Sequence, residues 1–115
     1  MSITIYHNPR CSKSRQTLEL LRAHGHEPHI IRYLESPPSV ADLQHILSGL
    51  GVKARDLMRR NERLYTELGL GNESLTEQEL LVAINQNPSL LERPVVVNGK
   101  RVAVGRPPEL VLEII

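Results

Sequence analysis

The chain contains a single cysteine, Cys11, and this scarcity limits the chemistry that it can perform. One cysteine cannot form an intramolecular disulfide, so the protein is not a disulfide-stapled scaffold. A reducing compartment would keep the thiol available. An oxidised Cys11 has no resolving cysteine in the same chain, and another molecule must therefore reduce it.

Long hydrophobic runs and a leader with a cleavage signal are also absent, and we expect a cytoplasmic protein without membrane insertion or secretion. The formal net charge of +1 provides no broad electrostatic footprint for nucleic acid or a membrane surface. Aromatic residues make up only 3% of the chain, which predicts a core of Leu, Ile and Val.

Arginine is abundant by contrast, since it provides 11 of the 14 basic residues. Its planar guanidinium suits the bidentate capture of oxyanions. A composition bias of the genome would give the same excess. The positions of the arginines, and not their number, must therefore decide between the two explanations.

The first third of the chain has a strand-helix-strand pattern. Residues 3–6 predict a strand, and Asn8-Pro9 ends it because the residue before a proline avoids helical geometry. A helix should begin near Cys11 or Ser12 and stop at Gly25. Residues 29–33 predict a second strand, which would pair with the first in parallel through a right-handed crossover.

Helical signals fill the middle of the chain. Ser39 with Asp42, and Thr76 with Glu79, are capping pairs that predict two helices. Two further short helices are expected, one over residues 53–60 and one over 62–68 with Asn61 as its cap. Asn87-Pro88 should end the last of these segments.

A hairpin and a final helix are expected near the end of the chain. Asn98-Gly99 predicts a type I′ turn between strands at 95–97 and 102–104. The prolines at 107 and 108 fit the first turn of a helix. Its apolar residues should lie on the sheet: Leu110, Val111, Ile114 and Ile115.

This order, β-α-β, helices, then β-β-α, resembles the thioredoxin and glutaredoxin arrangement. The resemblance implies one α/β domain over residues 1–115, with a mixed four-stranded sheet and a helical insertion at about 39–88. In such folds the reactive cysteine begins the first helix. A cis-proline before the third strand faces it, and Pro94 occupies that place.

Cys11 is in a position that favours a thiolate, because unpaired N–H groups and the helix dipole act at a helix N-terminus. A free cysteine has a pKa of about 8.5, and lowering it by about two units requires roughly 2.7 kcal/mol. A helix terminus supplies only about 0.3–1 kcal/mol. A nearby cation is therefore needed, and Arg10, Lys13 and Arg15 are local candidates.

Characteristic residues occur at the start of the chain, in the segment after the second predicted strand, in the helical region and in the arginine-proline pairs. They are His7, Asn8, Pro9, Cys11, Ser14, Arg15, Thr17, Leu18, Tyr33, Leu34, Glu35, Pro37, Pro38, 55–61, Tyr65, 68–70, Arg93, Pro94, Arg106, Pro107 and Glu109. With these residues the chain resembles a named family from end to end: the glutaredoxin-coupled arsenate reductases and their relatives of unassigned substrate.

The resemblance implies that Cys11 attacks arsenate, and that glutathione and glutaredoxin complete the reduction to arsenite. It further implies that no cofactor is bound and that glutathione is a co-substrate. Three arginines of the family surround the oxyanion, and two residues stabilise the thiolate. The corresponding positions are Arg59, Arg93 and Arg106 for the oxyanion, and His7 and Ser14 for the thiolate. A shift of one residue would exchange Arg59 for Arg60.

Each of these residues also has an ordinary structural explanation. His7 could simply hydrogen-bond the backbone at a strand end, Ser14 could be a polar first-turn residue, and Arg59 could be a solvated helix residue. Arg93 and Arg106 flank prolines at element boundaries, where loops carry function. The four other histidines form no ligand set with Cys11, and we expect no metal site.

Other functions fit less well. A phosphatase-like enzyme needs Cys-x5-Arg, but Thr17 occupies that position, and a dithiol oxidoreductase needs a second cysteine where Ser14 stands. The alternatives left open are an Spx-like regulator that binds RNA polymerase, and a monothiol reductase of another oxyanion or of a glutathione mixed disulfide. The segment from Arg10 to Ser14 favours the latter, because its cations depart from the usual reductase motif. We expect a monomer.

Overall fold

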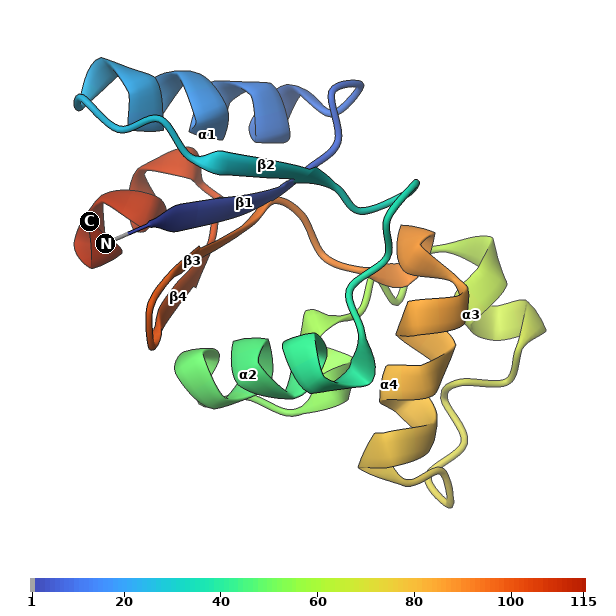
Figure 1. Ribbon diagram of the computed structural model, residues 1–115. Helices are drawn as coiled ribbons and strands as arrows, with labels where there is room; N and C mark the ends of the chain where they lie inside the picture. Colours follow the sequence, from blue (N-terminus) through green and yellow to red (C-terminus); the bar gives the residue numbers. More distant parts are fainter. Residues whose placement is uncertain (1) are drawn as a thin grey trace. The chain divides into compact units, whose positions relative to one another are not determined.

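A computed structural model describes residues 2–115 and divides the chain into two compact units. The sheet unit is built from the chain up to Ser36 and from Arg93 onward. The helical unit is the continuous segment Pro37–Glu92. Figure 1 follows the chain through both, and each unit is described below by itself.

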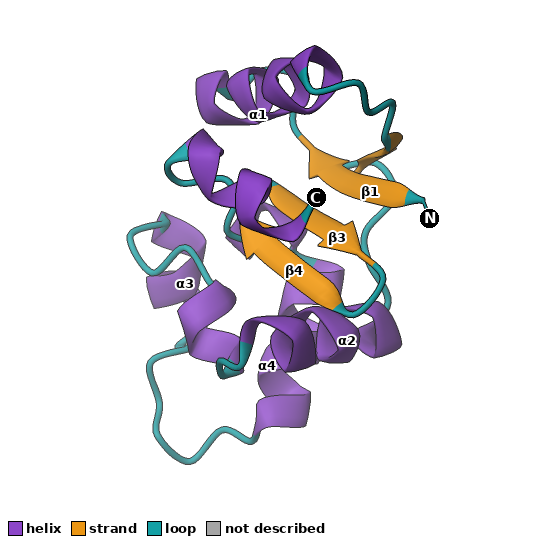
Figure 2. Cartoon of the chain, turned by 90° about the vertical axis from the view of Figure 1, so that its left-hand side faces the viewer, coloured by secondary structure: helices purple, strands orange, loops and turns teal. Residues whose placement is uncertain are grey.

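The sheet unit contains a mixed sheet of four strands in the order β2-β1-β3-β4. β1, β3 and β4 are labelled in Figure 2. The strands are β1 (Ile3–His7), β2 (His29–Arg32), β3 (Val95–Asn98) and β4 (Arg101–Val104). β1 pairs with β2 in parallel and with β3 in antiparallel, and β3 and β4 are also antiparallel. This confirms the predicted α/β class and mixed four-stranded sheet.

Helix α1 (Ser12–Ala23) and the 3₁₀ helix η3 (Pro108–Ile114) pack together with the sheet around one apolar core. In Figure 1 both lie beside the strands of the sheet unit. α1 ends where predicted, because Gly25 takes the left-handed conformation with φ 83°. The buried core consists of Ile3, Ile5, Leu18, Leu21, Val96, Ala103, Val111 and Ile114.

The hairpin between β3 and β4 is real, but its predicted turn is wrong by one residue. Asn98 pairs with Arg101, so Gly99 and Lys100 form the two-residue loop. Positive φ occurs at Gly99 and at no non-glycine residue from 2 to 115, which excludes the type I′ turn. Asn98 is retained in the strand because its side-chain amide donates to the Ile114 carbonyl at 2.6 Å.

The final helix differs from the prediction in its winding. It is a 3₁₀ helix, in which residues three apart lie on the same side. Val111 and Ile114 are accordingly buried, whereas Leu110 is 39% exposed. The expectation that Leu110 lies on the sheet is therefore wrong.

The helical unit contains α2 (Val40–Leu50), η1 (Ala54–Leu57), α3 (Arg63–Glu67), α4 (Glu77–Gln86) and η2 (Pro88–Leu90). Both predicted capping boxes are present, at Ser39 with Asp42 and at Thr76 with Glu79. α4 packs on α2, η1 and η2 through buried leucines and isoleucines. Within residues 2–115, no helix has the length and hydropathy that a bilayer crossing demands.

Two short helices of this unit differ from the sequence prediction. The predicted helix over 53–60 is reduced to η1, because Met58 is extended and pairs with Leu91. The Arg59 N–H continues this pairing by donating to the Leu90 carbonyl at 2.7 Å. α3 then begins after Glu62, and the prediction of Asn61 as its cap is wrong.

Candidate active site

Cys11 is the N-cap residue of α1, at the turn that leaves β1. Its N–H donates to the Asn8 carbonyl at 3.0 Å, and its own carbonyl accepts from the Arg15 N–H at 3.0 Å. Its side chain caps no backbone group and is partly exposed. The thiol is thus held at the first turn of α1, where N–H groups have no helical acceptor.

Two arginines from the C-terminal segment of the sheet unit lie close to this thiol. The Arg106 guanidinium lies with Nη2 3.8 Å from Cys11 Sγ, and its Nε donates to the Arg93 carbonyl at 2.7 Å. The Arg93 guanidinium is also a hydrogen-bonding neighbour of the Cys11 thiol. Arg93 and Arg106 therefore place two positive charges beside the sulfur.

Opposing influences act on the pKa of Cys11. Partial burial is the largest, and it raises the pKa. The hydrogen bond and charge of Arg93, together with the backbone N–H groups of Ser14 and Lys13, outweigh burial. The net result is a pKa below the ordinary value for cysteine, and the thiolate fraction at neutral pH rises accordingly.

His7 and Ser14 form a buried pair under the cysteine turn. The Nδ1 atom of His7 lies 2.6 Å from Ser14 Oγ, and that oxygen also accepts from the Asn8 N–H at 3.0 Å. Burial, and then the charges of arginines 32, 22 and 15, lower the pKa of His7. A neutral His7 linked to Ser14 therefore fixes the turn that carries the thiol.

Tyr33 is not among the site residues expected from the sequence, but the structure places it at this site. It is fully buried, and Arg93 and Asn8 are its polar neighbours. Burial raises the pKa of its phenol, and the Arg93 charge opposes this only in part. Within residues 2–115, neither Tyr33 OH nor Arg93 Nε makes a hydrogen bond of standard geometry.

Strand register could have identified Tyr33. His7 pairs with Arg32 in the parallel ladder of β1 and β2, so the residues that follow each of them leave the sheet at the same edge. Asn8 and Tyr33 are those residues. The rule that functional groups gather at the carboxyl ends of parallel strands would have included both.

Gly105 packs tightly against Pro94 and against Thr17 of α1. The Arg93–Pro94 peptide bond is cis, as is Arg106–Pro107. The Gly105 N–H donates to the Pro94 carbonyl at 2.9 Å. A Cβ atom on Gly105 would lie 2.8 Å from Pro94 Cγ and would also clash with Thr17 Oγ1. Only glycine therefore allows the chain to pass so close to α1 immediately before Arg106.

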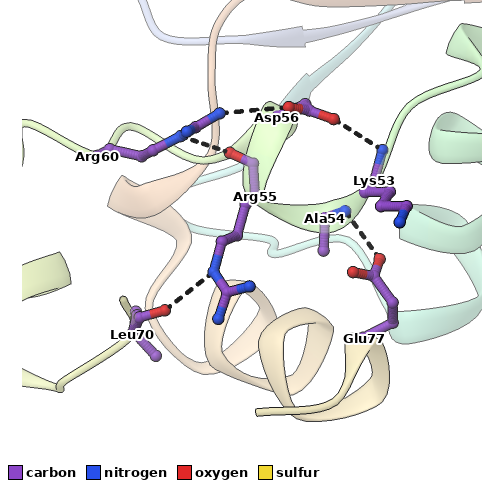
Figure 3. Close-up of polar contacts among 7 residues, drawn as sticks. All are labelled: Lys53, Ala54, Arg55, Asp56, Arg60, Leu70 and Glu77. Carbon is purple, nitrogen blue, oxygen red and sulfur yellow. Dashed lines mark hydrogen bonds and ion pairs between the residues drawn. The ribbon is translucent and has the colours of Figure 1, made fainter. Parts of the chain in front are cut away.

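Arg59, the third expected oxyanion ligand, lies in the helical unit, and its role stays a prediction. Its Nη1 atom pairs with Glu62 at 2.5 Å. The neighbouring Arg60 donates to the Arg55 carbonyl at 3.1 Å and to Asp56 at 3.2 Å (Figure 3). Both guanidiniums are thus engaged with carboxylates of their own unit.

The arrangement in the sheet unit suits attack on a small oxyanion. A cysteine with a lowered pKa provides the nucleophile, and two arginines provide fixed positive charge beside it. No group of three or more His, Cys, Asp or Glu side chains that could hold a metal ion occurs within residues 2–115.

Known proteins match this chain over nearly its whole length. The model of the ArsC family matches residues 6–114. The "Uncharacterized protein YfgD" of Escherichia coli (strain K12) is 53% identical over 98% of this chain and 96% of its own. An arsenate reductase of Haemophilus influenzae is 49% identical over the full length of both proteins. The solved structure of an arsenate reductase from Vibrio cholerae is 49% identical, with a TM-score of 0.97, over 100% of this chain and 98% of its own. The chain therefore belongs to the ArsC family.

Proposed function

We propose that this chain is an arsenate reductase in which the Cys11 thiolate is the nucleophile. The observation that carries the proposal is the partly exposed Cys11 thiol, with its lowered pKa, beside the guanidiniums of Arg93 and Arg106. Arsenate is a tetrahedral oxyanion, and fixed guanidinium donors suit both its ground state and the charge that develops during attack.

The first step forms a bond between sulfur and arsenic. The Cys11 thiolate attacks arsenic(V), and one arsenate oxygen leaves as water after accepting protons. Arg93 and Arg106 bind the remaining oxygens, and Arg59 completes the set on the basis of the family resemblance. His7 and Ser14 hold the cysteine turn in place through their hydrogen bond.

Reduction requires an external thiol, because the chain has no second cysteine. A glutathione thiolate attacks the Cys11 sulfur, and the electron pair of the sulfur-arsenic bond stays with arsenic, which leaves as arsenite. Glutaredoxin and a second glutathione then reduce the mixed disulfide on Cys11. Overall, arsenate and two glutathiones give arsenite, glutathione disulfide and water, and no bound cofactor is needed.

The test is an NADPH-coupled assay with arsenate, glutathione, glutathione reductase and glutaredoxin, in which each component is omitted in turn. We expect arsenate-dependent NADPH oxidation that needs every component. Cys11→Ser should abolish it and leave the circular dichroism spectrum unchanged, because the side chain is partly exposed. Ser12→Ala, at the exposed next residue, is the matched control and should retain activity. Turnover in the Cys11→Ser variant would refute the mechanism.

A second substrate is favoured by one observation, the cationic segment Arg10-Cys11-Ser12-Lys13-Ser14. Added cations suit a larger anionic partner such as a glutathione mixed disulfide or another oxyanion. Absence of arsenate-dependent oxidation, together with reduction of a glutathionylated peptide by wild type but not by Cys11→Ser, would support this candidate over arsenate.

A further inference from the structure

A groove of about 220 Å³ lies at the carboxyl edge of β1 and β2. One wall is the segment from His7 to Arg10, and the other contains Arg32, Leu34 and Glu35. β1 and β2 are parallel, and α1 connects them. Crevices outside the carboxyl ends of parallel strands are where such folds bind ligands.

Three exposed charged side chains line this groove. The side chains of Arg10, Arg32 and Glu35 form no hydrogen bond or ion pair within residues 2–115. Leu34 beside them is 45% exposed, although it is a large apolar residue. The groove therefore offers two cations, one anion and an apolar surface.

We propose that this groove binds glutathione, a proposal that rests on the function proposed above. At neutral pH the tripeptide carries two carboxylates, one ammonium group and a thiol on its central residue. The two carboxylates match Arg10 and Arg32, and the ammonium matches Glu35. The glutathione backbone lies along Leu34.

The position of the groove also suits the order of the reaction. Arg10 immediately precedes Cys11 in the sequence, so the groove adjoins the turn that carries the thiol. Arg93 and Arg106, which contact the Cys11 thiol, do not line the groove. Arsenate and glutathione thus use different arginines and do not compete.

The first experiment measures binding without chemistry. S-methylglutathione, which has no free thiol, is titrated into the full-length ¹⁵N-labelled protein and followed by NMR. We expect saturable shifts of the amides of His7, Asn8 and Arg10 and of those at 32–35. Saturable binding with the largest shifts elsewhere, or no binding at millimolar concentration, would refute the groove, and neither result depends on whether arsenate is a substrate.

The second experiment measures the KM for glutathione in the coupled assay. Arg10→Ala and Arg32→Ala should each raise it about three- to tenfold, as expected for the loss of one partly exposed carboxylate contact. The KM for arsenate should stay unchanged. Arg101→Ala, at an exposed arginine of β4, is the control and should alter neither constant.

A third comparison identifies which carboxylate each arginine binds. Glutathione monoethyl ester lacks the glycine carboxylate, so the arginine that binds that group should show no further loss when mutated. Arsenate turnover with an unchanged KM for glutathione in both variants would overturn the groove and leave the proposed function intact. If arsenate turnover is absent but the expected NMR shifts are seen, the proposed function is overturned and the glutathione groove is retained.

Discussion

At the level of single residues, Arg93 connects the two halves of the site in the sheet unit. Its guanidinium neighbours both the Cys11 thiol and the Tyr33 phenol, and its carbonyl accepts from Arg106 Nε. Burial disfavours the charge of Arg93, but the hydrogen bonds and charges of Cys11 and Tyr33 outweigh burial and raise the pKa of Arg93. One residue thus supplies charge to the thiol and orients the second arginine.

Arg93→Ala should raise the pKa of Cys11, because it removes both a hydrogen bond and a charge that lower it. The rate of alkylation by iodoacetamide, measured against pH, should reach its plateau at higher pH than in wild type. We also expect kcat/KM for arsenate to fall roughly 100-fold or more, as for the loss of an oxyanion donor. An unchanged alkylation profile would contradict the role of Arg93, and Arg101→Ala is the control.

Residues that stand in a functional pattern could be predicted from the sequence, whereas a residue that matters through its position in the fold could not. Cys11 is conspicuous because it is solitary and opens a helix. Tyr33 is one of the markers of the family resemblance, but its residue type alone predicts no role, since tyrosine at the end of a strand is ordinary. Its importance comes from the parallel register of β1 with β2, which places it beside Asn8.

At the level of elements, the contact of Gly105 with α1 positions the arginine that follows it. Gly105→Ala should destabilise the protein by about 1–3 kcal/mol, because the added methyl group would clash with Thr17 and Pro94. Chemical denaturation monitored by circular dichroism measures this loss. Gly71→Ala is the control, since its added Cβ would meet only Tyr65 at 3.8 Å, an ordinary contact. Equal stability of the two variants would contradict the tight packing of Gly105.

The loop after η1 contains the two arginines that the sequence could not separate. If Arg59 is the third oxyanion ligand, Arg59→Ala should raise the KM for arsenate about tenfold or more, and Arg60→Ala should have little effect. Each substitution removes one ion pair between an arginine and a carboxylate of the helical unit, so each variant serves as the control for the other. The reverse result would exchange their roles.

Local signals predicted elements well, and long-range pairing explains the errors. The capping boxes at Ser39 and Thr76 act within one helical turn, and the helices began where expected. Residues 53–60 have a helical pattern, but the pairing of Met58 with Leu91 holds the backbone at Met58 in an extended conformation. Asn98 was similarly expected in a turn, and its bond to Ile114 keeps it in β3. Neither partner could be identified from the local sequence.

For the molecule as a whole, His7 makes stability depend on pH. Burial and neighbouring arginines lower its pKa in the folded state, so below the ordinary value of 6.5 the unfolded chain binds this proton more readily. The free energy of unfolding should therefore fall as pH decreases from 7 to 5. Urea denaturation should show a smaller fall in His7→Gln than in wild type.

The exposed residue His29 provides the control for this prediction. His29→Gln should lose as much stability as wild type over the same pH range. If all three proteins lose stability equally, the contribution of His7 is absent.

The sheet unit is discontinuous in sequence, which affects how a newly made chain acquires its reactivity. Ribosomes add about 5–20 residues per second, starting from the N-terminus. Arg106, which contacts Cys11, is added 95 residues after it. β1 likewise cannot pair with β3 until β3 has been made. The nascent cysteine therefore keeps the pKa of an ordinary thiol until the residues that lower it have been added and the sheet unit has folded.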